Sequence, residues 1–147
     1  MIPNLFAKRP LPNPKLTKAL EKAIKEVKKQ KTKSAALKKA YNIISRRKHA
    51  GKWQTYIFLH KIWLSPEQIM KEKGFLHCSN INYLLRILLI NSGKFKEEDI
   101  KHKFSLIYYL SPHQYMQVKT EKGWTDVDPW GAKYGLKLGQ YAHSFNV

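Results

Sequence analysis

The sequence predicts an α+β fold, in which N-terminal helices and a central cysteine-bearing helix pack on a small antiparallel β-sheet. Apolar residues recur at helical spacing in the N-terminal part, and three short runs typical of strands follow. A turn, Glu121-Lys122-Gly123, joins the last two runs. Helices followed by hairpin-connected strands are the order of an α+β domain. The length of 147 residues and the hydrophobic fraction of 43% suit one domain with a packed core.

Two amphipathic helices are expected in the N-terminal third. Four prolines in residues 1–14 predict an extended leader. A first helix is then indicated by an apolar stripe at helical spacing: Leu16, Leu20, Ile24 and Val27. Residues 28–33 are mostly lysine and break this stripe. Ser34 is expected to cap a second helix, whose stripe is Leu37, Tyr41 and Ile44.

The middle of the chain contains a clear helix start. Residues 53–63 are rich in aromatic and aliphatic side chains without a clear period, and we expect a helix there. The motif Ser65-Pro66-Glu67-Gln68 follows. Ser can cap a helix, Pro suits the first helical position, and Gln68 can complete a capping box. Gly74 is expected to end this short helix.

The next helix is predicted to begin at Cys78 and to lie at the centre of the domain. Apolar residues cover much of its circumference, which is typical of a buried helix: Ile81, Leu84, Leu85, Leu88 and Leu89. Asn91-Ser92-Gly93 is expected to close it. After an acidic turn, strands are predicted at residues 104–110, 115–120 and 124–127.

The positive charge is concentrated at the N-terminal end. The formal net charge is +18, and residues 1–52 contribute +14 of it because only Glu21 and Glu26 oppose their lysines and arginines. Such a surface could contact nucleic acid or another polyanion through residues 8–52. The ordinary alternative is a solvated helix face, because a run of charges is weak support for a partner.

Composition also predicts a compartment. A single cysteine, Cys78, excludes an intramolecular disulfide framework and favours a reducing environment. The longest apolar run, residues 83–90, contains Arg86 and is too short to span a bilayer. We therefore expect a cytoplasmic protein without a membrane span. The histidines and the cysteine have no paired ligand spacing, so neither a metal site nor a cofactor is predicted.

The most informative feature is the position of Cys78. It would stand at a helix N-terminus, where unpaired N–H groups and the helix dipole favour a thiolate. His113 follows at the start of an extended segment, and Asp126 and Asp128 follow on the next. A thiol, an imidazole base and a carboxylate that orients it are the parts of a cysteine nucleophile. The alternative is a buried, inert cysteine.

These residues resemble the transglutaminase-like superfamily, in its small, single-domain prokaryotic form. The resemblance rests on the Ser65 helix start, Cys78 before a Leu-rich helix, His113 opening an extended segment, and Gly123-Trp124 before Asp128-Pro129. It covers about residues 34–135, which gives a basic leader and helix at residues 1–33 and a transglutaminase-like domain at residues 34–147. The family has a papain-like core.

The resemblance implies a catalytic triad of Cys78, His113 and Asp128. Asp126 remains an alternative by strand spacing alone, because residues two apart share one face of a strand; the Asp-Pro step of the family favours Asp128. The family places Gly two residues before the nucleophile, where this chain has Leu76. His77 would flank the thiol.

Further site residues are expected around this triad. The oxyanion needs a donor besides the backbone N–H of Cys78, and Gln54, Trp53 and Trp63 are the candidates. Glycines and aromatic residues after Asp128 suit a loop that faces substrate. The candidates for contact with substrate are Tyr115, Trp130 and Tyr134.

Two functions are compatible with these features. The first is a cysteine enzyme that acts on a peptide or protein amide or isopeptide bond through a thioester, with hydrolysis favoured over cross-linking because no flanking domains accompany this short chain. The second is a non-catalytic transglutaminase-like binding module whose basic N-terminal helices contact nucleic acid.

Overall fold

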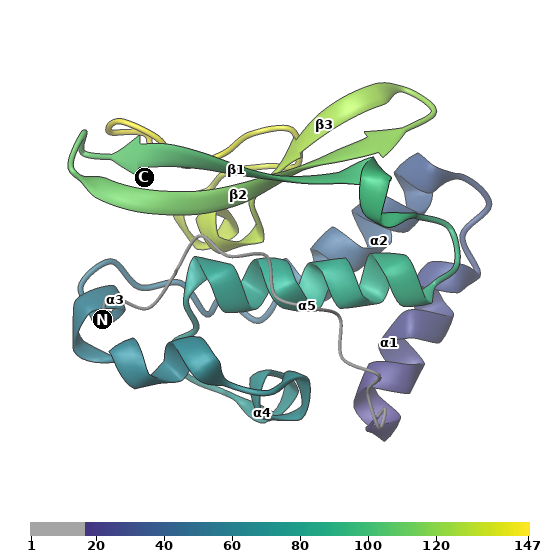
Figure 1. The fold of residues 1–147 in the computed structure, drawn as a ribbon, viewed down its shortest axis with the longest axis horizontal. Helices are drawn as coiled ribbons and strands as arrows, with labels where there is room; N and C mark the ends of the chain where they lie inside the picture. Colours follow the sequence, from purple (N-terminus) through teal and green to yellow (C-terminus); the bar gives the residue numbers. More distant parts are fainter. Residues whose placement is uncertain (1–16) are drawn as a thin grey trace.

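A computed structural model describes residues 17–147, so the expected leader and Leu16 lie outside the described residues. The fold class is α+β, with helices and one three-stranded antiparallel sheet (Figure 1). The α-helices are α1 (Lys18–Lys28), α2 (Lys33–Ser45), α3 (Gln54–Ile57), α4 (Pro66–Lys71) and α5 (Cys78–Asn91). The 3₁₀ helices are η1 (Leu59–Trp63), η2 (Glu97–Asp99) and η3 (Pro129–Tyr134), and the strands are β1 (Ile100–Ile107), β2 (Ser111–Thr120) and β3 (Gly123–Val127).

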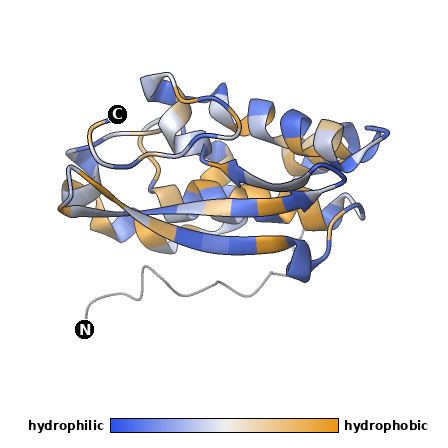
Figure 2. Ribbon diagram, turned by 90° about the horizontal axis from the view of Figure 1, so that it is seen from above, coloured by the Kyte–Doolittle hydropathy of each residue, from blue (hydrophilic) through white to orange (hydrophobic). Residues whose placement is uncertain are grey.

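The sheet has β2 at its centre, paired antiparallel with β1 and with β3. The register places Ser105 opposite His113 and Met116 opposite Val127. The sheet forms a layer over the helices, with α5 running beneath it (Figure 1). Orange hydrophobic segments on the helices lie under the strands in Figure 2. The start of β2 therefore lies in the same region as the first turn of α5, which contacts that strand.

Helix α5 is the centre of the core, as the sequence predicts. Its buried apolar residues run along nearly its whole length: Ile81, Tyr83, Leu84, Leu85, Ile87, Leu88 and Leu89. One charge is buried among them, because Arg86 is 4% exposed. Its guanidinium donates from Nε and Nη2 to the Glu97 carboxylate, at 3.1 and 2.8 Å to Oε1. This pair ties α5 to the segment that leads into β1.

Helix α1 belongs to the same core, although it carries much of the charge. Leu20, Ile24 and Val27 are buried, and α1 packs against α2 and α5. Thr17 caps α1, since its hydroxyl accepts the N–H of Leu20 at 3.3 Å. Of the helices in the part of the chain that the structure describes, none has the length and apolar character to cross a membrane.

Two local expectations are corrected. Helix α2 is capped by Thr32, whose hydroxyl accepts the N–H of Ala35 at 3.1 Å, rather than by Ser34. Ser34 bonds instead to the carboxylate of Glu121. Residues 53–63 form α3 and η1 rather than one helix. Their apolar side chains are largely exposed, so no buried stripe holds a longer helix together.

Other boundaries match the expected motifs more closely. The capping box of Ser65 and Gln68 at the start of α4 is present. Helix α4 ends at Lys71, before Gly74, where the carboxylate of Glu72 accepts the Gly74 N–H at 2.7 Å. The first two strands differ from the expected ranges: β1 begins earlier, at Ile100, and ends at Ile107, because residues 108–110 form the hairpin turn, and β2 begins earlier, at Ser111.

Candidate active site

Cys78 is the first residue of α5, and its neighbours fix the position of that helix end. His77 is the N-cap in extended conformation and makes no side-chain cap bond. Its ring is buried instead, with Nε2 2.8 Å from the Phe58 carbonyl and an edge contact with Phe75. Burial lowers the pKa of His77, so the ring is neutral and donates to that carbonyl. His77 therefore anchors the helix start rather than facing solvent.

Two asparagines extend this anchoring along the first turns of α5. The buried Asn80 donates from Nδ2 to the Lys61 carbonyl at 3.0 Å. Asn82, also buried, donates from Nδ2 to the Gln114 carbonyl at 2.9 Å, which lies next to His113 on β2. These bonds attach the Cys78 end of α5 to η1 on one side and to β2 on the other.

His113 and Asp128 form a buried pair. His113 Nε2 lies 2.7 Å from Asp128 Oδ2, and the two side chains are 3% and 0% exposed. Asp128 also accepts the N–H of Ala142 at 2.8 Å and the N–H of Gly131 at 3.3 Å. Asp126 accepts from Gln117 Nε2 at 2.8 Å instead. The structure therefore pairs His113 with Asp128, not with Asp126.

The charge state of His113 depends on both of its neighbours. Burial on its own would lower the pKa of this imidazole. The negative charges of Cys78 and Asp128 oppose that effect, together with hydrogen bonds to both side chains, and raise the pKa of His113 to about 10. Because Nε2 is committed to Asp128, Nδ1 is the ring nitrogen left for the Cys78 sulfur. His113 therefore lies between the Asp128 carboxylate and the Cys78 side chain.

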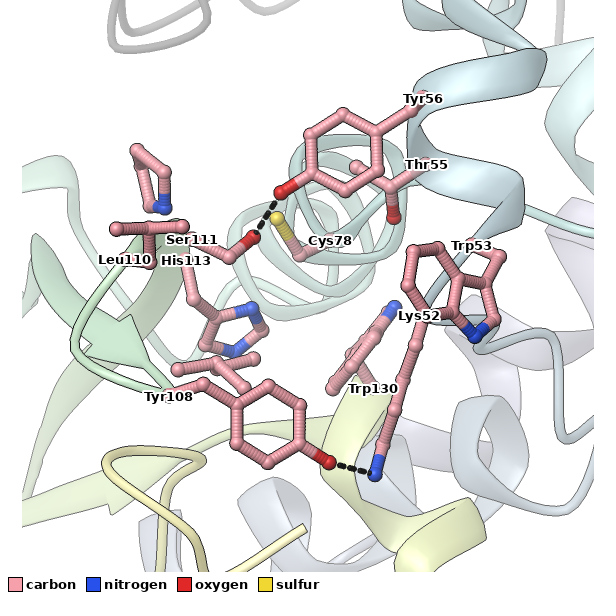
Figure 3. Close-up of a pocket in the computed structure, with 12 residues that line it drawn as sticks. Lys52, Trp53, Thr55, Tyr56, Cys78, Tyr108, Leu110, Ser111, His113 and Trp130 are labelled. Carbon is pink, nitrogen blue, oxygen red and sulfur yellow. Dashed lines mark hydrogen bonds between the residues drawn. The ribbon is translucent and has the colours of Figure 1, made fainter.

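Cys78 and His113 open onto a pocket of about 540 Å³ (Figure 3). Its other walls come from the segment before and within α3, the β1–β2 hairpin and η3. The remaining lining residues are Lys52, Trp53, Thr55, Tyr56, Ile107, Tyr108, Leu110, Ser111, Pro112 and Trp130. The thiol is half-buried, so a reagent or substrate in this pocket can reach it.

The candidate oxyanion donors are placed differently from one another. The first N–H groups of a helix have no partner within it, so the backbone N–H of Cys78 is free of helical bonding. Trp53 lines the pocket and is 79% exposed. Gln54 and Trp63 are not among the lining residues; the Gln54 amide packs over Gly51.

Of the three candidates for contact with substrate, only one lines the pocket. Trp130 lines the pocket and is buried, with its ring 4.8 Å from that of His113. Tyr134 packs behind it at 5.1 Å and is not a lining residue. Tyr115 is buried outside the pocket and stacks on Tyr141 at 4.1 Å. Trp130 is thus the one of these three that borders the thiol.

Leu76 does not obstruct the site. Its side chain is buried in the hydrophobic core, and its N–H donates to the His49 carbonyl at 3.1 Å. It is absent from the pocket lining. The Leu76 side chain therefore lies in the core and not in the pocket wall.

Five polar lining residues were not expected from the sequence: Lys52, Thr55, Tyr56, Tyr108 and Ser111. The Tyr56 hydroxyl lies 2.6 Å from Ser111 Oγ and joins α3 to β2 across the pocket (Figure 3). Lys52 Nζ donates to the Tyr108 hydroxyl. No local motif marks these residues. The only signal is the aromatic run at residues 53–63, whose apolar side chains are too exposed to belong to the core.

Within residues 17–147, no group of three or more His, Cys, Asp or Glu side chains is arranged to hold a metal ion. Comparison with models of known families, with curated proteins and with solved structures gave no match for this chain.

Proposed function

We propose that this chain is a cysteine-dependent amide hydrolase with a transglutaminase-like core, in which Cys78, His113 and Asp128 form the catalytic triad. The observation that carries the proposal is the buried His113–Asp128 pair, 2.7 Å apart, at the wall of the pocket into which the Cys78 thiol opens. Three segments far apart in the sequence bring these groups together. A buried imidazole held by a fully buried carboxylate is the arrangement that orients a base toward a nucleophile.

The first half of the reaction uses the thiolate. The Cys78 sulfur attacks the carbonyl carbon of the amide, a C–S bond forms, and the π-electron pair moves to the oxygen. When this intermediate collapses, the C–N bond breaks and the His113 imidazolium gives its proton to the departing nitrogen. A free amine leaves, and the acyl group stays on Cys78 as a thioester.

The second half regenerates the enzyme. His113, now neutral, takes a proton from water as the water oxygen attacks the thioester carbonyl. The C–S bond breaks, a carboxylic acid leaves, and the thiolate–imidazolium pair returns. Water reaches the half-exposed thiol, which favours hydrolysis. A primary amine in place of water would give transamidation by the same steps.

The developing oxyanion needs donors that are already oriented. The backbone N–H of Cys78 supplies one. We assign the second to the Tyr56 hydroxyl, because it lines the same pocket and is held toward it by Ser111 at 2.6 Å. When Tyr56 donates to substrate, the Ser111 hydroxyl can donate to the Tyr56 oxygen.

The test is the pH dependence of Cys78 alkylation by iodoacetamide. With an ion pair, the rate persists well below pH 8, where a free thiol loses reactivity. The His113→Ala variant should lose this acidic reactivity, and the matched control, His143→Ala at an exposed site, should keep it. Identical profiles for the wild type and His113→Ala would overturn the proposed triad.

A second candidate function is contact with a polyanion such as nucleic acid. Helices α1 and α2 bury their apolar stripes, and these helices together with the segment between them expose a set of lysines: Lys18, Lys22, Lys25, Lys28, Lys29, Lys31 and Lys38. Among their carboxylates, Glu26 pairs with Lys29 and Lys39. Oligonucleotide affinity that falls steeply with added salt would support this function.

A further inference from the structure

Lys52 places a positive charge on the wall of the candidate active site. It lines the same pocket as Cys78 and His113, and its ammonium donates to the hydroxyl of Tyr108, another lining residue. The ammonium also lies over two aromatic rings, 5.0 Å from the centre of Tyr108 and 4.9 Å from that of Tyr134. All three contacts are with neutral groups.

This arrangement holds the ammonium without a direct ion pair, while the Tyr108 hydroxyl that accepts from it donates in turn to the main-chain oxygen of Val147 at 2.8 Å. In residues 17–147, the ion pairs formed by lysines involve Lys29, Lys33, Lys39 and Lys61, and Lys52 is not among them. Aromatic faces hold a cation by their quadrupole and leave its charge uncompensated. An ammonium on the wall of a pocket, carried by a residue of intermediate exposure, is then a recognition group for an anion, with which it can form a charge-assisted hydrogen bond.

The wall between this charge and the triad is apolar. Trp53 and Trp130 line the pocket together with Cys78 and Lys52 (Figure 3), and Ile107 is a further apolar lining residue. A substrate that fills it needs a bulky apolar group near the scissile carbonyl and an anionic group beyond it. The last residue of a peptide supplies both on the leaving side of one amide bond: an apolar side chain and the terminal carboxylate.

We propose that Lys52 is a carboxylate-binding residue, and that the substrates are amides of apolar amino acids with a free carboxylate, such as the C-terminal residue of a peptide. This inference rests on the proposed cysteine hydrolase function. The thiolate attacks the penultimate carbonyl, the C–N bond breaks, and His113 protonates the nitrogen of the departing amino acid while its carboxylate stays on Lys52. The acyl group remains as a thioester until water releases it.

The test uses two alkylating reagents that differ in one charge. N-bromoacetyl-phenylalanine carries the free carboxylate, and its carboxamide does not. Each reacts by forming a bond from the Cys78 sulfur to the methylene carbon as bromide leaves. The ratio of their rates measures recognition of the carboxylate. The ratio for 6-(bromoacetylamino)hexanoate and its carboxamide, which keep the same electrophile, lack the phenylalanine part and hold the carboxylate far from the reacting carbon, corrects for the attraction of any anion to a basic protein.

In the wild type, the corrected ratio should favour the carboxylate by about tenfold, the effect of one charge-assisted contact in a pocket. Lys52→Gln should bring the corrected ratio to about one, and Lys52→Arg should retain a preference. Lys31→Gln removes the same charge on the exposed surface of the chain and should keep the tenfold value.

The outcomes separate the two proposals. A corrected ratio of one in the wild type, or the same preference in Lys52→Gln, overturns the carboxylate site even if Cys78 is reactive. The wild-type ratio decides this without depending on the folding of any variant. If iodoacetamide reacts equally with the wild type and His113→Ala, the triad fails, whatever the ratio.

Discussion

His113 holds a positive charge in a place where burial alone would remove it. The ring is 3% exposed, yet Asp128 on one side and Cys78 on the other stabilise the imidazolium. The same two contacts orient the ring, because each of its nitrogens faces one partner. Charge and orientation at this residue therefore have one origin, and a change at Asp128 must affect both.

The raised pKa of His113 predicts how stability depends on pH. A histidine whose pKa is 6.5 unfolded and about 10 folded adds stability that is fully present below pH 6.5. That contribution is lost as the pH rises toward 10, so the free energy of unfolding should decline over this range. Urea unfolding at several pH values, with His113→Gln for comparison, measures it. An equally steep decline in His113→Gln would show that other groups are responsible.

Replacing Asp128 by asparagine keeps the size of the side chain and removes its negative charge. The carboxylate accepts from His113 and from two backbone N–H groups, and an amide of the same size brings donors of its own to that site. We expect a loss of about 1–3 kcal/mol in unfolding free energy. Cys78 alkylation at pH 6 should slow by about tenfold or more.

Asp126→Asn is the matched control for that substitution. Asp126 lies two residues away, and its partner is Gln117 rather than His113. Its alkylation rate should equal that of the wild type. If Asp126→Asn slowed the reaction and Asp128→Asn did not, then Asp128 would not be the carboxylate that orients His113.

At the scale of elements, the site depends on how α5 is attached to β2. Asn82 on α5 donates to the backbone carbonyl of Gln114, the residue after His113, so a buried bond joins the helix that begins at Cys78 to the strand that carries His113. Asn82→Ala removes this donor and should lower the unfolding free energy by about 1–3 kcal/mol. It should also reduce Cys78 alkylation at pH 6, because His113 is less firmly placed.

The control for Asn82 is Asn91→Ala, at the other end of the same helix. The Asn91 amide donates to the Ile87 carbonyl, and the residue is exposed. Thermal unfolding should show a small change, and the alkylation rate should stay at the wild-type value. Equal loss of acidic reactivity in both variants would mean that helix stability, not the tie to β2, controls the site.

The elements that the sequence predicts well are those with strong local signals. The box formed by Ser65 and Gln68 starts α4, and the apolar circumference of α5 predicts its burial. Residues 53–63 were predicted wrongly as one helix, because their apolar residues line a pocket or face solvent instead of packing on a core. Periodicity reports burial against a core, and a pocket wall has no such period.

The candidate site likewise contains residues that the sequence predicts and residues that it does not. Cys78, His113 and Asp128 could be named from the sequence, because helix-start position and strand order are local properties. Strand spacing alone treats Asp128 and Asp126 alike, and only the Asp-Pro step of the resemblance favoured Asp128; in the structure the bonds to His113 and Gln117 distinguish the two. Lys52 reaches the pocket through tertiary packing, which no spacing encodes.

At the scale of the whole molecule, charge and core are distributed differently. The N-terminal residues carry most of the net charge of +18, yet α1 packs in the same core as α2 and α5. Deleting the basic region would therefore expose the core, and a loss of binding after deletion would have two explanations. Substitutions on the exposed face avoid this problem, because they leave the buried residues Leu20, Ile24 and Val27 in place.

A polyanion contact predicts a specific response to such substitutions. Changing Lys22, Lys25 and Lys28 to glutamine removes three exposed charges from α1. If each contacts a phosphate, the slope of log affinity for an oligonucleotide against log salt should fall by about 0.7–0.9 for each lysine lost. Fluorescence anisotropy with a labelled oligonucleotide at several salt concentrations measures that slope.

The matched control removes three exposed lysines from the sheet and its hairpins: Lys101, Lys103 and Lys122. Net charge then changes equally, but the charge on α1 is intact. A smaller slope in the α1 variant alone locates the contact on that helix, whereas equal losses in both sets mean that the anion responds to the overall charge. Cys78 alkylation, measured in the same variants, should be unchanged in both sets, since none of these lysines lines the pocket. Binding and catalysis would then occupy separate surfaces of one core.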